Sequence, residues 1–131
     1  MFEWDDKYLV GRADIDAEHK ALFRHAQELH LAIEEDRAQV ELASLFARLA
    51  AYTRFHFAGE EELMRHNRFP GMEQHLREHQ KLAGRVAQLE REFESGKSRV
   101  DRSTLQLLRQ WLNHHVLDSD QSIAGHLRDA R

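Results

Sequence analysis

The sequence contains no cysteine, only one proline and only six glycines among 131 residues. Without cysteine the chain can form no disulfide framework, and without thiolate ligands an iron–sulfur cluster is disfavoured. A reducing compartment is compatible with this composition. Because proline and glycine are the residues that most often interrupt helices, their scarcity favours long, continuous helices.

Other absences narrow the function classes. No apolar run approaches the roughly 18 residues that a membrane span needs. The opening MFEWDDKYLV is acidic and lacks the apolar core of a signal peptide. The formal charge is −4, and the basic residues are scattered, which is not the electrostatic footprint of a nucleic-acid-binding protein. We expect one cytoplasmic domain over residues 1–131, with no nucleic-acid partner and no membrane span.

Apolar residues recur with the 3.6-residue period of amphipathic helices. This pattern predicts helices over about 14–35, 38–66, 70–94 and 103–118, preceded by an extended N-terminal arm over 1–13. The connections are short, so neighbouring helices should be antiparallel. The expected fold class is all-α, an up-down-up-down antiparallel four-helix bundle.

Residues typical of helix starts lie at or near the beginning of each predicted helix. The candidates are Asp14 or Asp16 for the first helix, Asp36 with Gln39 for the second, Pro70 for the third, and Ser103 with Gln106 for the fourth.

Histidine is the one residue type in marked excess, with ten in the chain. His56 and Glu60 are four residues apart, and so are His75 and His79, a spacing that puts each pair on one helix face. A glutamate on the apolar side of a helix is costly unless it is paired or binds a metal, so Glu60 indicates coordination. Glu61 and Glu62 are expected to face solvent.

Two further helices contribute residues of the same character. His19 lies on the apolar face of the first helix, and His115 on that of the fourth. His114 points about 100° away from His115, so only one of them can face the core. Asp120 comes five residues after His115 and reaches the same region if the helix widens there. Imidazole and carboxylate ligands together suit divalent iron, zinc or manganese.

These elements resemble the hemerythrin family in order and spacing over essentially the whole chain. The matching motifs are I-D-x-E-H (Ile15 to His19), H-F-x-x-E (His56 to Glu60), H-x-x-x-H (His75 and His79) and H-x-x-x-x-D (His115 to Asp120). The opening W-D-D (Trp4 to Asp6) and the E-E-L-M-R and F-P segments around the second turn are similar to those of the single-domain bacteriohemerythrins.

The resemblance implies a non-haem site of two iron ions, cycling between Fe2+ and Fe3+ and bridged by an oxo or hydroxo group. His75, His79 and His115 would hold one iron, and His19 and His56 the other. Glu60 and Asp120 would bridge the two irons. The iron with only two histidines would have an open position, and dioxygen would bind there. Leu112 matches the family's pocket-lining leucine, and the ligand pocket is expected to include Leu22, Phe23, Leu108 and Leu112.

Three functions remain open from the sequence. The first is reversible dioxygen binding for storage, delivery or local sensing, by a protein that is not an enzyme, or has only weak redox activity. The second is a di-iron enzyme, such as a peroxidase, an oxidase or a nitric-oxide-handling protein. The third is a structural zinc bundle, which would need fewer ligands. For the first function we expect a monomer; its recipient, a membrane oxygenase or another oxygen-using protein, is not specified.

Overall fold

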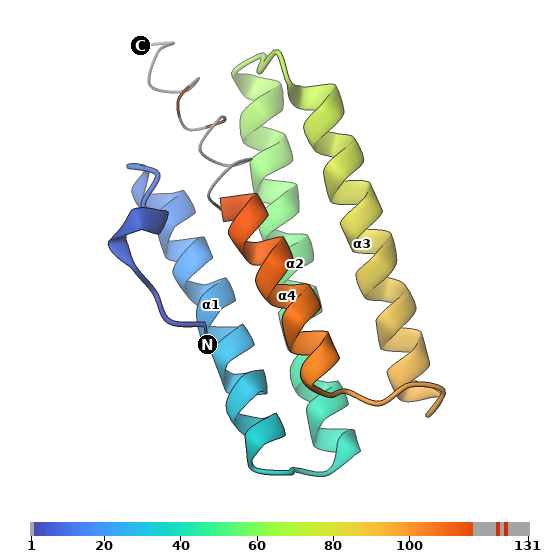
Figure 1. The fold of residues 1–131 in the computed structure, drawn as a ribbon. Helices are drawn as coiled ribbons and strands as arrows, with labels where there is room; N and C mark the ends of the chain where they lie inside the picture. The colour runs from blue at the N-terminus through green and yellow to red at the C-terminus, as the bar shows by residue number, and fades with distance from the viewer. Residues whose placement is uncertain (1, 117–122, 124, 126–131) are drawn as a thin grey trace.

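The computed structural model describes residues 2–116, 123 and 125. Its described part contains a short 3₁₀ helix, η1 (Asp6–Tyr8), and four long helices, α1 (Ala13–Glu34), α2 (Gln39–His66), α3 (Met72–Glu94) and α4 (Arg102–His114). Successive helices are joined at alternate ends of the molecule and run antiparallel (Figure 1). The structure confirms the predicted all-α four-helix bundle.

The apolar stripes of the four helices meet along the bundle axis. Leu22, Phe46, Leu49, Leu105 and Leu112 are almost fully buried in one hydrophobic cluster. α1 packs against both α2 and α4, and α2 also packs against α3. Burial of these side chains, at about 1.5–3 kcal/mol each, is the main force that holds the helices together.

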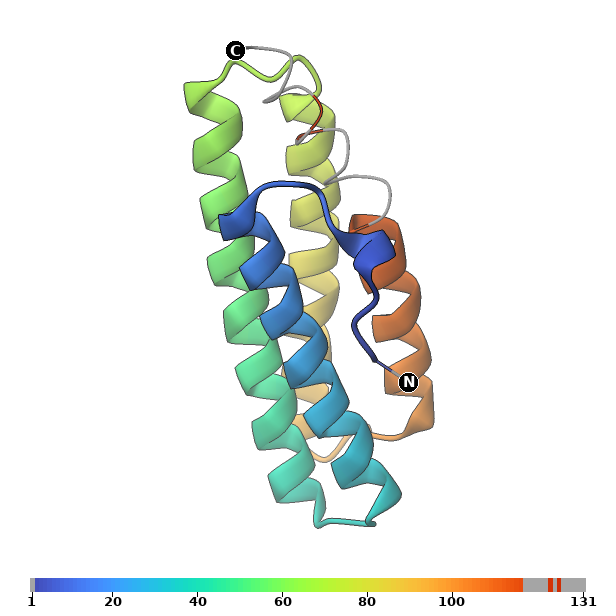
Figure 2. The ribbon, with the colours of Figure 1, turned by 90° about the vertical axis from the view of Figure 1, so that its left-hand side faces the viewer.

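The N-terminal arm lies along α1 and reaches α4 (Figure 2). Phe2 and Tyr8 are buried, and the Tyr8 and Phe23 ring centroids are 4.7 Å apart. The Tyr8 hydroxyl donates a hydrogen bond of 3.4 Å to Oδ1 of Asn113. The sequence predicted an extended arm, but the arm is interrupted by η1. This short helix begins where the Asp5 carboxylate accepts a 2.9 Å hydrogen bond from the Lys7 amide.

The predicted start signals of the first two helices were wrong. Arg12, rather than Asp14 or Asp16, occupies the cap position of α1, and the Asp16 carboxylate instead accepts a 2.8 Å hydrogen bond from the Val10 amide. The cap position of α2 is Ala38, and Asp36 lies two residues earlier, in the turn between α1 and α2, with a positive φ of 53°. The Gln39 side chain instead forms two hydrogen bonds with the Val100 backbone, which tie the start of α2 to the α3–α4 loop.

The other two starts are also displaced. Pro70 lies in the turn before α3, whose cap position is Gly71. The capping box of α4 is formed by Asp101 and Thr104 rather than by Ser103 and Gln106. The last residues predicted for the fourth helix, 117 and 118, lie outside the described residues.

None of the helices in the described part of the chain is long and apolar enough to cross a membrane.

Candidate metal centre

Six buried polar side chains converge at one level of the bundle. The structure brings together His19 from α1, His56 and Glu60 from α2, His75 and His79 from α3, and His115 from the end of α4. Each is at most 5% exposed. Burying so many polar side chains in an apolar core is costly unless they interact with one another or with a bound ion.

The Glu60 carboxylate stands at the centre of this cluster. Its Oε1 lies 3.0 Å from Nε2 of His56, 3.0 Å from Nε2 of His115 and 3.4 Å from Nε2 of His79. Its Oε2 lies 3.9 Å from Nε2 of His75. Four imidazoles from three helices therefore direct the same ring nitrogen at one carboxylate.

The donor atoms form two overlapping groups. In one, the donor atoms of Glu60, His75, His79 and His115 all lie within 4.8 Å of one another. In the other, those of His19, His56 and His115 meet the same limit. The two groups share His115, whose Nε2 is 3.1 Å from Nε2 of His56. The described residues thus offer two adjacent positions for cations.

The local sequence explains this placement. The four-residue spacings within α2 and α3 stack each pair on the inward face of its helix. At the end of α4, residues 115 and 116 adopt the wider turn of a π-helix. Such widening is common at functional sites and is the condition under which Asp120 was expected to contribute. Asp120 itself lies outside the described residues.

Two carboxylates behind the cluster orient its imidazoles. Oε1 of Glu18 accepts a 2.9 Å hydrogen bond from Nδ1 of His56, and Oε1 of Glu61 accepts one of 3.3 Å from Nδ1 of His79. When Nδ1 donates, a neutral imidazole carries its lone pair on Nε2, which here faces Glu60. Carboxylates commonly fix metal-binding histidines in this way.

These two acids were missed or misplaced from the sequence. Glu61 was expected to face solvent, but it is only partly exposed and lies against His79. Glu18 is the glutamate of the I-D-x-E-H motif, but no role was assigned to it. Its contact with His56 of α2 depends on how the helices pack.

Three other histidines do not join the cluster. His114 is exposed, as the helix geometry predicted. His66 is also exposed, and its Nε2 lies 3.1 Å from the Glu62 carboxylate. His25 packs on the Tyr52 ring, and partial burial lowers its pKa.

The residues expected to form the ligand pocket are all buried in the bundle. Leu22 and Leu112 are 0% exposed, and Phe23 and Leu108 are each 4% exposed. All four belong to the main hydrophobic cluster, so the surroundings expected of the ligand are apolar.

The donor set fits a pair of iron ions. Five imidazoles and one carboxylate converge without any thiolate, a combination suited to iron. A structural zinc site would normally be complete with four ligands, fewer than the six that meet here. The lone pairs on Nε2 of His56 and His79 face a carboxylate oxygen, an arrangement that repels unless a cation or a proton lies between them.

Comparison with known proteins agrees with this geometry. Residues 10–127 match the family model described as hemerythrin HHE cation binding domain. The chain is 30% identical over 128 residues to a bacteriohemerythrin of Stenotrophomonas maltophilia (strain R551-3), covering 98% of this chain and 82% of the relative. It is 29% identical over 126 residues to the myohemerythrin of Riftia pachyptila, covering 96% and 93%. A solved structure of wild-type hemerythrin superimposes with a TM-score of 0.90 at 26% identity, covering 95% of this chain and 96% of that one.

Proposed function

The chain belongs to the hemerythrin family, and we propose that its buried histidine cluster holds two iron ions at which dioxygen binds reversibly. When bound, the iron pair supplies the electrons for reversible binding of dioxygen. The observation that supports this proposal best is the Glu60 carboxylate, with four Nε2 atoms directed at it between 3.0 and 3.9 Å.

The proposed ligands divide between the two metal positions. His75, His79 and His115 would hold one iron, and His19 and His56 would hold the other. Glu60 would be shared by both positions, and Asp120 is proposed as a further ligand on the family motif alone. The grouping of donor atoms around His115 and Glu60 supports the first position, and the grouping of His19 with His56 supports the second.

The rest of the chain controls what reaches this centre. Glu18 and Glu61 hold two imidazoles in the orientation that presents Nε2 inward. Leu22, Phe23 and Leu112 are apolar and buried, so they offer water no hydrogen-bonding partner and the bound ligand no proton. A dry pocket prevents side reactions and lets bound dioxygen leave unchanged.

The alternative, a di-iron enzyme, is not favoured. Hemerythrins are oxygen-binding proteins rather than enzymes, and the relatives include proteins named bacteriohemerythrin and myohemerythrin. Ferritin-like di-iron oxidases use mostly carboxylate ligands, whereas five imidazoles converge here. Neutral nitrogen ligands make the irons less electron-rich, which disfavours strongly oxidising chemistry.

We further propose that the protein acts as a monomer in the cytoplasm, where a chain without cysteine needs no disulfide formation. There it would store dioxygen, deliver it to an oxygen-using recipient or report its local level.

Metal analysis of two neighbouring variants tests the ligand assignment. The parent should carry two irons per chain, His115→Ala should lose iron, and His114→Ala should retain the parent amount because its side chain is exposed. Circular dichroism shows whether each variant keeps its helices. The assignment would be contradicted if the His115→Ala protein were helical and kept both irons. It would also be contradicted if His114→Ala lost iron while His115→Ala did not.

A further inference from the structure

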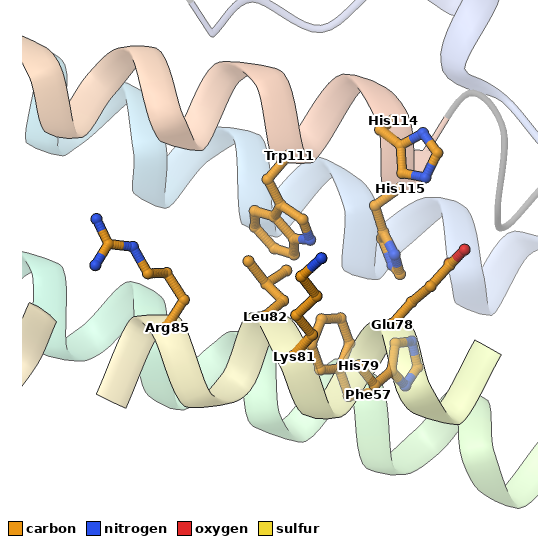
Figure 3. A pocket seen from close by; sticks show the side chains of 9 residues that line it. All are labelled: Phe57, Glu78, His79, Lys81, Leu82, Arg85, Trp111, His114 and His115. Carbon is orange, nitrogen blue, oxygen red and sulfur yellow. The ribbon is translucent and has the colours of Figure 1, made fainter. Parts of the chain in front are cut away.

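A cavity of about 340 Å³ opens between α3 and α4, and His79 and His115 are among the residues that line it (Figure 3). Its size falls within the range of small-molecule sites, at the lower end. It lies on a different side of α4 from the expected dioxygen pocket, because Trp111 lines the cavity whereas Leu112, the next residue, is fully buried.

The floor of the cavity is aromatic. The Trp111 ring stacks on His115, with centroids 5.7 Å apart and an interplanar angle of 28°. Phe57 stacks on His79 at 3.8 Å and 7°, and Trp111 meets Phe57 edge to face at 6.0 Å. Leu82 adds an aliphatic surface beneath Trp111. A planar aromatic ring is the shape that such a floor binds best, because offset and edge-to-face ring contacts add to its burial.

The rim of the cavity is mainly cationic. Lys81 and Arg85 are exposed and four residues apart on α3, so their like charges lie one above the other and repel. Within the residues that the structure describes, neither of them forms an ion pair. Among the described residues that line the cavity, Glu78 is the one carboxylate, a turn before Lys81. Two adjacent cations beside an aromatic floor, in a protein of net charge −4, favour an anion with an apolar body.

We propose that this cavity binds a small planar aromatic carboxylate. Its ring lies against Trp111, Phe57 and Leu82, and its carboxylate meets Lys81 and Arg85. The occupant would touch the outer faces of His79 and His115 without entering the buried cluster. The proposal does not depend on dioxygen binding, and its failure would leave the proposed function unaffected.

Calorimetric titration of the iron-loaded protein with 2-naphthoate tests the site. We expect saturable binding of one molecule per chain, at least tenfold weaker in the double variant Lys81→Gln/Arg85→Gln and in Trp111→Leu. The neutral 2-naphthamide should bind at least fivefold more weakly than the carboxylate, and added salt should weaken carboxylate binding because the two cations are exposed.

A matched control exists on α1, where Lys20 and Arg24 are also four residues apart and line a hollow beside Trp4. Lys20→Gln/Arg24→Gln removes the same charge and should change the affinity less than twofold. The proposal is wrong if 2-naphthoate does not bind at millimolar concentration, if the Lys81→Gln/Arg85→Gln protein keeps the parent affinity, or if the α1 control loses binding equally. Helical content by circular dichroism and iron content should match the parent in every variant compared.

Discussion

Glu60 is the residue on which the buried cluster depends most. It is 1% exposed, and imidazole nitrogens from three helices lie 3.0 to 3.9 Å from its two oxygens. A charged group buried in an apolar core is costly unless it is paired or binds a metal. The proposed iron pair would supply positive charge at this point, which would account for an acidic side chain on the apolar face of α2.

The hydrogen bond between Glu18 and His56 leads to a prediction about iron affinity. This hydrogen bond fixes the ring of His56, so Glu18→Ala should weaken iron binding by about 10–100-fold while leaving the fold intact. Glu18→Gln keeps an oxygen acceptor for Nδ1 and should restore part of the affinity. Competition with a chelator measures both. Glu28→Ala, which removes an exposed acid elsewhere on α1, serves as the control. Equal iron affinity in Glu18→Ala and the parent would show that Glu18 has no positioning role.

Leu112 carries a prediction about the lifetime of bound dioxygen. Leu112→Ala opens space in a fully buried position, and Leu112→Asn adds a polar group that recruits water. Both variants should bind dioxygen but decay to the ferric form faster than the parent, with asparagine faster than alanine. Stopped-flow mixing of reduced protein with oxygen follows this decay.

Two comparisons make the Leu112 experiment specific. Leu45→Ala removes a partly buried leucine that packs against the same core from α2. It should lower stability without speeding decay. A decay rate for Leu112→Asn that equals the parent rate would show that the apolar wall does not protect the bound ligand.

At the scale of single elements, α4 depends on its capping box. Hydrogen bonds from Ser103 are the largest cause that lowers the pKa of Asp101. A carboxylate with a lowered pKa stabilises the fold above its unfolded value of 3.8, and this contribution is lost as pH falls through the folded pKa. Asp101→Ala should therefore lower the free energy of unfolding by about 1 kcal/mol at neutral pH, with the difference shrinking in acid.

Urea denaturation at neutral and acidic pH measures this effect. Gln106→Ala is the control, because Gln106 was the capping partner predicted from sequence but is exposed in the structure. If Gln106→Ala were the more destabilising of the two, the capping box would be misassigned.

The helices themselves could be predicted because each one carries an apolar stripe long enough to identify without tertiary information. Their start points could not. A cap depends on where the backbone enters the helix. The side chains of Asp16 and Gln39 instead accept hydrogen bonds from the amides of Val10 and Val100, which lie outside their own helices. Such contacts follow from packing, which a local pattern does not contain.

The candidate site, like the helices, could be predicted where one helix determines the position of a residue but not where contacts join different helices. The inward residues were predictable, since four-residue spacing and the apolar face together determine where His56, Glu60, His75 and His79 point. The contacts of Glu18 with His56 and of Glu61 with His79 were not, because they join different helices. The cavity beside Trp111 likewise arises from the separation of α3 and α4, which no pattern along one helix encodes.

At the scale of the whole molecule, the bundle surrounds the cluster with apolar side chains, and each of the four helices contributes at least one of the proposed ligands. Such a site ties metal binding to the packing of all four helices. The same packing places the buried Leu112 and the cationic cavity at Lys81 on different sides of α4.

The most direct test of the account is the visible spectrum of the iron-loaded, anaerobically reduced protein as oxygen is admitted and then removed. An absorption band should appear with oxygen, disappear when the oxygen is removed under inert gas, and return over repeated cycles with little loss. A protein that stays oxidised after the gas is removed, and that consumes oxygen continuously when given a reductant, would contradict reversible binding and would instead be a di-iron enzyme.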